Sequence, residues 1–171
     1  MQRRARLRRT ALLCLHCLRN LAFYRETLSA QARWNGQQYW ATATNNFLDI
    51  AVLEWCKLFG ERNGKHNWKK SVSQHNAFEL SLLARLNWSA QQFEEYIQGM
   101  RKYRDKFVAH LDEQNLYTIP SMDPAISSAQ HLYDWLLEHE SDCDAFPDAP
   151  EDSSTYFTEA AQHARSRHAA A

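Results

Sequence analysis

Arg104 and His110, near the end of the segment Arg101–His110, are the residues in this chain whose types and spacing best suit chemistry on a phosphate. Histidine exchanges protons close to neutral pH, which makes it the usual general acid or base in proteins. Arginine stays charged and can hold two phosphate oxygens through its planar fork. The pair therefore has the parts needed for acid–base chemistry at a phosphate.

The spacing of the two residues sets a geometric condition on that chemistry. In one regular helix, six residues give a rise of about 9 Å and leave the side chains about 120° apart. Either a local irregularity or the pairing of two protomers is then needed to bring them into one cleft. A purely structural interpretation is also open. A helix C-terminus favours a histidine such as His110, and Arg104 could pair with neighbours of Asp105 or with Glu54 across a bundle.

Apolar residues recurring every three or four positions predict the helices that must position this pair. We expect helices at about residues 5–33, 37–59, 68–86 and 90–110. A fifth helix should have Asp123 as its N-cap and Pro124 as its first residue. Gly60 stands where a C′ glycine belongs, and Ser89 with Gln92 has the spacing of a capping box. The expected apolar markers of the first two helices are Leu7, Ala11, Cys14, Leu18, Leu21 and Leu28, then Tyr39, Ala43, Phe47, Ile50, Leu53 and Phe59.

The predicted fold is therefore all-α, an up-and-down bundle of four to five helices over residues 1–140. Residues 141–171 contain acidic residues, Pro and Ser, and we expect a tail that is partly disordered or forms a short helix near 155–166. Two cysteines and a histidine occur together at Cys14, His16 and Cys17. On a helix His16 points away from the two thiols, so no metal site is expected there.

The stretch Arg-Asp-Lys-Phe-Val-Ala-His over 104–110, together with Asn-Phe-Leu-Asp-Ile-Ala-Val-Leu-Glu-Trp over 46–55, resembles the R-x(4–6)-H motif and bundle of the HEPN superfamily. HEPN stands for higher eukaryotes and prokaryotes nucleotide-binding, and the likeness is greatest to its abortive-infection type. It covers roughly residues 5–140. The resemblance implies an HEPN-like fold and a metal-independent endoribonuclease that acts as a toxin or antiphage effector in a homodimer.

RNA carries its own nucleophile, the 2′-OH, so cleavage needs a proton acceptor, a proton donor and a cation on the phosphorane. We predict His110 as the general acid and base and Arg104 as the phosphate clamp, with no cofactor or metal. The supporting residues would be Asp105, Asp49, Asn46 and Glu54, the last three either lining the cleft or facing water. Arg101, Lys102, Lys106, Lys65 and Lys69 would contact RNA, with Trp68 available to stack a base. A solvated basic loop is the other interpretation of residues 62–70.

The resemblance further implies three partners: a second copy of the chain, an RNA substrate such as tRNA or mRNA, and an antitoxin protein. In antitoxin-controlled relatives a Tyr often follows the motif histidine by two residues and is modified, but Asp112 stands at that position here. An alternative function is a catalytically inactive HEPN module that binds RNA, nucleotide or protein. A third is a structural helical dimer without a site.

Composition excludes several other classes of protein. The chain has 171 residues with 20 Lys+Arg and 20 Asp+Glu, so it is not a basic nucleic-acid binder throughout. The charge is nevertheless graded, because residues 1–33 hold eight Arg and one acid, whereas residues 138–159 hold eight acids and no Lys or Arg. The acidic end could lie over a basic site, or both ends could be solvated surface. No glycine-rich phosphate loop occurs, and four cysteines make no disulfide framework.

The N-terminal stretch superficially resembles a targeting sequence, because an Arg-rich start precedes the apolar run 11–18. His16 interrupts that run, and no small-x-small cleavage site follows it. Since the apolar spacing continues to Leu28, we interpret the stretch as the first helix of the domain. No apolar run reaches membrane-spanning length, so we expect a cytoplasmic protein with no membrane partner.

Overall fold

The computed structural model describes residues 3–30, 37–105, 118–140 and 146–169. These ranges contain six α-helices and no strand, which confirms the all-α prediction. A π-helical segment, η2, extends the second helix over Cys56–Gly60, and a single 3-10 turn, η3, covers Trp68–Lys70. The α-helices are α1 (Arg3–Ser29), α2 (Gln38–Trp55), α3 (His75–Leu86), α4 (Ala90–Tyr103), α5 (Asp123–His139) and α6 (Ser153–Ala169).

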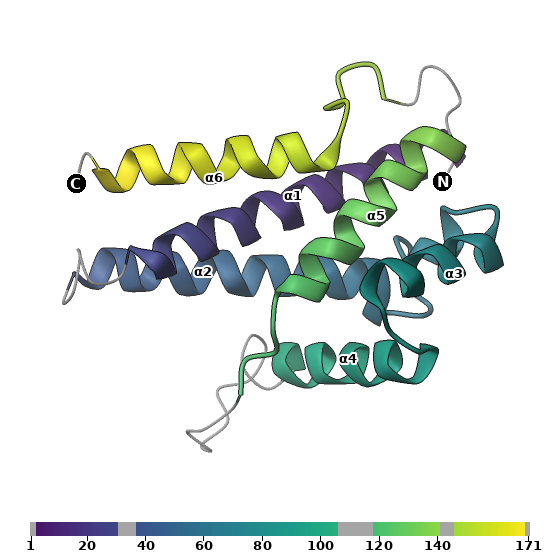
Figure 1. Cartoon of the computed structure of the whole chain (residues 1–171), viewed down its shortest axis with the longest axis horizontal. Coiled ribbons are helices and arrows are strands. Elements are labelled where there is room, and N and C mark those ends of the chain that lie inside the picture. The colour runs from purple at the N-terminus through teal and green to yellow at the C-terminus, as the bar shows by residue number, and fades with distance from the viewer. Residues whose placement is uncertain (1–2, 31–36, 106–117, 141–145, 170–171) are drawn as a thin grey trace.

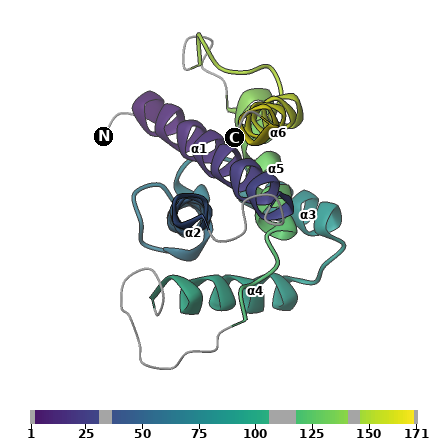
Figure 2. The same ribbon diagram turned by 90° about the vertical axis from the view of Figure 1, so that its left-hand side faces the viewer.

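Helix α1 is the central element of the bundle. It contacts α2, α5 and α6, and both views place it between α6 on one side and α2 on the other (Figures 1 and 2). Helix α4 lies on the opposite side of the molecule from α6, below α2 and α5 in Figure 1. The candidate residues at the end of α4 are therefore far from the C-terminal helix.

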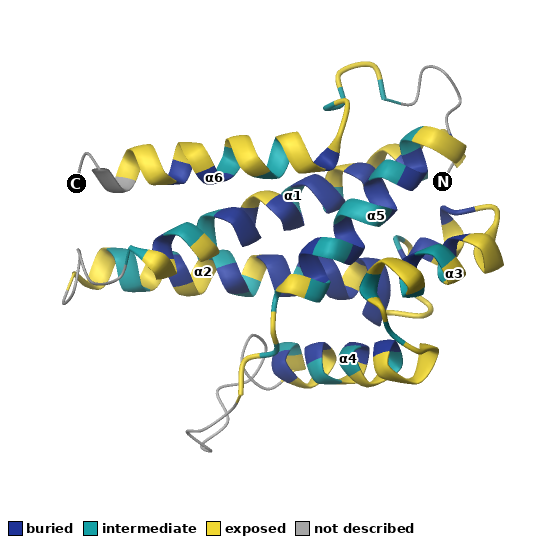
Figure 3. Ribbon diagram, in the orientation of Figure 1, coloured by how far each residue is buried: buried dark blue, intermediate teal, exposed yellow. Residues whose placement is uncertain are grey.

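The central position of α1 explains its burial pattern. The expected markers Leu7, Ala11, Cys14, Leu18 and Leu21 are all buried, as Figure 3 shows for most of the helix. Leu15, Cys17 and Ala22 on other faces are buried too, because three helices surround α1. The prediction for Leu28 is wrong: it lies in the last turn and is 46 % exposed.

The predicted buried face of α2 is turned from the observed one. Tyr39 and Ile50 were expected in the core but are exposed, whereas Leu48 and Val52 are buried. The fully buried Trp55 fixes the rotation of the helix, since its Nε1 donates to Ser128 Oγ at 2.9 Å. Around that indole lie the rings of Phe59, Phe93 and Tyr96.

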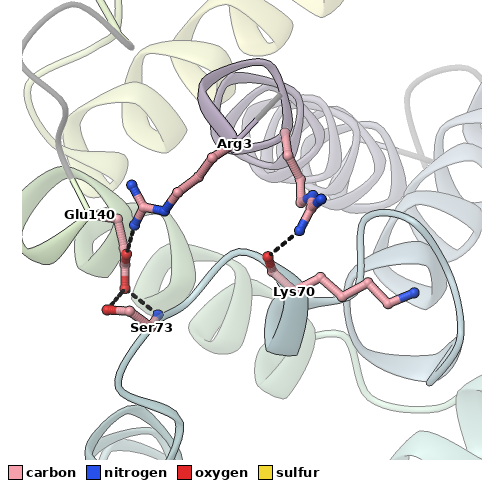
Figure 4. A network of polar contacts seen from close by, with 5 residues as sticks. Arg3, Lys70, Ser73 and Glu140 are labelled. Atoms are coloured by element: carbon pink, nitrogen blue, oxygen red, sulfur yellow. Dashed lines mark hydrogen bonds and ion pairs between the residues drawn. The ribbon is translucent and has the colours of Figure 1, made fainter. Parts of the chain in front are cut away.

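The predicted third helix is split at residues 71–74. Asn67 caps the short η3 turn by accepting from the Lys69 N–H at 3.1 Å, and α3 begins only at His75. Between them the buried carboxylate of Glu140 accepts from the N–H and the hydroxyl of Ser73 and pairs with Arg3 (Figure 4). These bonds satisfy the backbone of Ser73 outside a helix, which is why the helix does not run through.

The starts of α4 and α5 agree with local capping rules to within one residue. Ser89 and Gln92 form the predicted capping box of α4. Asp123 is the first residue of α5 rather than its cap, which is Met122, so Pro124 sits one position further in than expected.

Residues 153–169 form a longer helix than the one expected near 155–166. It begins where the Asp134 carboxylate accepts from the Ser153 N–H at 3.1 Å and from its hydroxyl at 2.9 Å. Ala161 and Ala164 are buried in α6, which packs along α1. Among the described residues, no helix is long and apolar enough to cross a membrane.

Candidate functional site

Arg104 and Asp105 continue the helical chain directly beyond Tyr103, the last residue of α4. The Arg104 side chain is only 16 % exposed. Its Nε donates to Asp105 Oδ1 at 2.8 Å and its Nη1 donates to Glu61 Oε1 at 3.0 Å. Burial alone would lower the pKa of Arg104, but the bond to Asp105 and the charge of Glu61 raise it, so the guanidinium stays cationic.

The predicted partner of Arg104 lies beyond the described part of the chain. His110 and Lys106 both fall within residues 106–117, which are outside the described residues. The described portion of the site consequently ends at Asp105. The expected alternative pairing of Arg104 with Glu54 is wrong, because Glu61 and Asp105 occupy the guanidinium instead.

Gly60 brings η2 and α4 close enough for the Glu61–Arg104 contact. A Cβ added at Gly60 would lie 3.2 Å from Arg101 Cγ, which is a tight contact. The expectation that Gly60 is a left-handed C′ residue is wrong, since Glu61 follows as the cap and Gly60 has no left-handed φ. Its small size matters for packing, and the next residue supplies a carboxylate to the site.

The three polar residues of α2 do not share one cleft. Asp49 faces the end of α4, where its Oδ1 lies 3.5 Å from the Tyr103 hydroxyl, and burial raises the pKa of this carboxyl. Asn46 is exposed. Glu54 faces α1 and lies 3.5 Å from His16 Nδ1, so it contributes nothing to Arg104. Asp49 therefore contacts the end of α4, whereas Glu54 does not.

The predicted RNA-contacting residues fall into two groups. Arg101 and Lys102 are exposed and, with Gln98 and Asp105, line an open cavity of about 330 Å³ beside Arg104. Lys65, on the loop that follows Glu61, and Lys69, in η3, are exposed. The prediction that Trp68 stacks a base is wrong, because its ring is 4 % exposed and lies under the Lys69 ammonium at 5.2 Å.

Burial also determines the reactivity of the two cysteines of α1. Cys14 and Cys17 are buried and His16 faces away from them toward Glu54, as helical spacing predicts. Burial raises the pKa of both thiols, which keeps them protonated and unreactive. No group of three His, Cys, Asp or Glu residues that could hold a metal occurs in the described ranges.

Sequence reasoning missed Glu61 and Tyr103 as parts of the site. Glu61 is the first residue after a helical stretch rich in buried residues, and it precedes a loop whose other charges are cationic. The arginine that pairs with Glu61 comes from 43 residues further along the chain. Helix spacing alone does not reveal such a long-range pair.

Comparison of the chain with protein-family models, with curated proteins and with solved structures yields no match. The functional conclusion therefore depends on the residues and geometry described above.

Proposed function

We propose that this chain is an HEPN-type endoribonuclease that cleaves RNA by 2′-OH attack, without a metal, in a homodimer. The observation that carries the proposal is the fixed guanidinium of Arg104, held by Asp105 and Glu61 at the end of α4 in an all-α bundle. Because the Arg104 side chain is already held in one position, binding a phosphate costs little additional side-chain entropy. Such preorganisation of charge is a common source of catalysis.

Arg104 keeps donors for a phosphate despite its two carboxylate partners. A guanidinium has five N–H donors. Nε and one N–H of Nη1 are used by the two carboxylates, and Nη2 lies 2.7 Å from Asp105 Oδ1. At least one N–H on each terminal nitrogen is thus left to donate to phosphate oxygens. Arg101 and Lys102, on the open cavity beside it, would extend the contact along an RNA backbone.

The proposed reaction is an internal transfer at phosphorus. His110 accepts the proton of the 2′-OH as that oxygen attacks the adjacent phosphate, and a proton is returned to the leaving 5′-oxygen. Arg104 stabilises the negative charge that builds on the phosphorane. The products are a 2′,3′-cyclic phosphate and a free 5′-OH. Two protomers would place both Arg–His pairs around one cleft, with tRNA or mRNA as substrate and an antitoxin or trigger as the control.

A second candidate is the catalytically inactive HEPN module that binds RNA, nucleotide or protein. One observation favours it: Glu61 and Asp105 together carry more negative charge than Arg104 carries positive charge. A site with this excess of negative charge would bind a phosphate weakly unless one of the two carboxylates moved away or was neutralised.

The deciding experiment compares inducible expression of the wild type, Arg104→Ala, His110→Ala and the control Arg62→Ala. Arg62 is an exposed arginine in an ion pair with Glu94 at 2.8 Å, so its loss removes an equal charge outside the site. We expect growth arrest and new RNA fragments with cyclic-phosphate ends in the wild type and in the control. Both effects should disappear in the other two variants, with circular dichroism spectra unchanged.

The purified protein extends the test. Cleavage of total RNA in the presence of EDTA would support a reaction that needs no metal. Cleavage that persists in both Arg104→Ala and His110→Ala would refute the mechanism. RNA binding without cleavage, in every condition tried, would favour the inactive module.

A further inference from the structure

Cations from three separate segments meet around His66, in the loop between η2 and η3. The charges that act most strongly on this imidazole are Arg9, Lys57, Lys65 and Arg6. Burial and these four cations lower the pKa of His66, so the ring adds no further charge near neutral pH. The surrounding field is therefore positive even though the whole chain has zero formal net charge.

Hydrogen bonds fix this arrangement between the start of α1 and the loop. Arg6 Nη1 donates to the Lys70 carbonyl at 3.0 Å, which ties α1 to η3. Lys70 Nζ in turn donates to the Asn63 carbonyl at 2.8 Å across the loop. We call this surface the basic patch; it consists of Arg6, Arg9, Lys57, Lys65, Lys69 and Lys70.

We propose that the basic patch binds the phosphate backbone of an RNA helix. The proposal rests on the proposed function only in taking RNA as the polyanion. Five of the six side chains are exposed and Arg6 is partly so, which leaves their charges open to a ligand. A cluster of exposed cations is the usual means of binding a phosphate backbone, and counterion release supplies the affinity.

The lack of exposed apolar residues distinguishes a nucleic-acid backbone from a membrane surface. Stable anchoring on a membrane surface adds apolar side chains that enter the lipid beside the cations. Trp68, which precedes the patch residues Lys69 and Lys70 in the chain, is buried. Leu12, the nearest exposed large apolar residue of α1, lines a different cavity with Arg8 and Phe146.

The same burial of Trp68 predicts how RNA is read. Single-strand binders stack bases on exposed aromatic rings, whereas helical RNA is bound mainly through its shape and phosphates. We therefore expect the patch to bind a duplex segment of RNA with little preference for its sequence. The loop that carries Lys65 starts at Glu61, which binds Arg104, so a helix held on the patch lies close to the candidate site.

The test measures RNA binding by fluorescence anisotropy in a His110→Ala background, so that cleavage does not interfere. The variant Arg9→Glu with Lys65→Glu is compared with Arg8→Glu with Arg167→Glu. Both pairs change the net charge equally, and Arg8 and Arg167 are exposed residues that line other cavities. The probes are a short RNA duplex, a single strand of the same composition, and vesicles containing phosphatidylserine.

We expect the parent protein to bind the duplex and to lose roughly 100-fold in affinity between about 50 and 200 mM salt, as about four phosphate contacts imply. The patch variant should bind at least tenfold more weakly, with a salt dependence lower by about two contacts. The control should stay within about twofold. Equal loss in both variants would overturn the proposal, because it would show an effect of net charge alone.

Two other outcomes would also overturn the assignment. Preference for the single strand would point to base contacts that the patch does not provide. Binding to vesicles but not to duplex would identify a membrane surface instead. The nuclease proposal can fail separately. If the wild type binds duplex RNA through the basic patch but does not cleave RNA, the binding proposal holds and the nuclease proposal is refuted.

Discussion

Oδ1 of Asp105 lies 2.8 Å from Nε and 2.7 Å from Nη2 of Arg104, so a single carboxylate oxygen sets the plane of the guanidinium. Glu61 holds the other edge at 3.0 Å from Nη1. The arginine is thereby immobilised, but its two partners also oppose the approach of a phosphate. Orientation and phosphate affinity are in conflict at this position.

Neutralising Glu61 should expose that conflict. Glu61→Gln keeps an oxygen that can accept from Nη1 but removes one negative charge. We expect RNA to bind about two- to fivefold more tightly, the range that a partly exposed ion pair supports. Fluorescence anisotropy with a short RNA, again in the His110→Ala background, measures the change.

The matched control is Glu94→Gln, which removes an equal charge from an ion pair with Arg62 at 2.8 Å. If Glu61→Gln and Glu94→Gln have the same effect, Arg104 makes no contact with the phosphate. If the gain of Glu61→Gln survives in an Arg104→Ala background, the gain comes from general charge and the clamp role is refuted.

Local signals predicted much of the secondary structure because they act within a few residues. The Ser89–Gln92 capping box and the apolar spacing of α1 depend only on neighbours along the helix, and both are confirmed, except for Leu28 in the last turn of α1. The face of α2 was mispredicted because Tyr39 and Ile50 are apolar without being enclosed. What encloses a residue depends on which helices pack there. Helix α2 is enclosed chiefly by α1, and the rings of Phe93 and Tyr96 from α4 pack on Trp55 at its C-terminal end.

The site was predicted less completely because its contacts are long-range. Asp105 was found because it adjoins Arg104, whereas Glu61 was not, since 43 residues separate it from Arg104. The roles of Trp68 and Glu54 were misjudged for a related reason. Each has the chemistry for a site, but burial against the core or pairing with His16 removes it from the solvent side.

The two helical glycines should respond differently to alanine. Nothing lies within 4 Å of a Cβ added at Gly99 in α4, so Gly99→Ala should stabilise the fold by about 0.5–1 kcal/mol. At Gly60 the added Cβ meets Arg101 Cγ at 3.2 Å, so Gly60→Ala should gain less or lose stability. Urea unfolding gives both values. A larger gain at Gly60 than at Gly99 would show that the close contact with Arg101 does not restrain the fold.

The buried carboxylate of Glu140 should matter more than its exposed partner. Glu140→Ala leaves the N–H of Ser73 without its acceptor and should cost about 2–4 kcal/mol. Arg3→Ala should cost about 1 kcal/mol or less, because its side chain is 53 % exposed and Ser73 still binds the carboxylate. Urea unfolding of both variants tests the difference. Equal costs would mean that the Arg3 ion pair, and not the Ser73 bonds, holds this junction.

The imidazole of His131 should make the fold less stable in acid. It packs on Phe78 with ring centroids 5.2 Å apart, and its Nε2 lies 2.8 Å from Ser81 Oγ. Burial, with a smaller effect of the Arg85 charge, lowers its pKa from 6.5 to about 4. The unfolded chain binds a proton at this residue as the pH falls through about 6.5, whereas the folded protein does not until about 4.

The contribution of His131 is therefore complete above about pH 6.5 and is lost as the pH falls toward 4. His131→Leu removes this titration. The free energy of unfolding of this variant, relative to that of the wild type, should therefore rise steadily as the pH falls from about 6.5 to about 4. Ser81→Ala is the control, since it keeps the histidine and should keep the slope. Urea unfolding at a series of pH values measures all three proteins. If His131→Leu follows the wild-type slope, the ring does not stay neutral in the folded protein and its burial is less than the packing on Phe78 implies.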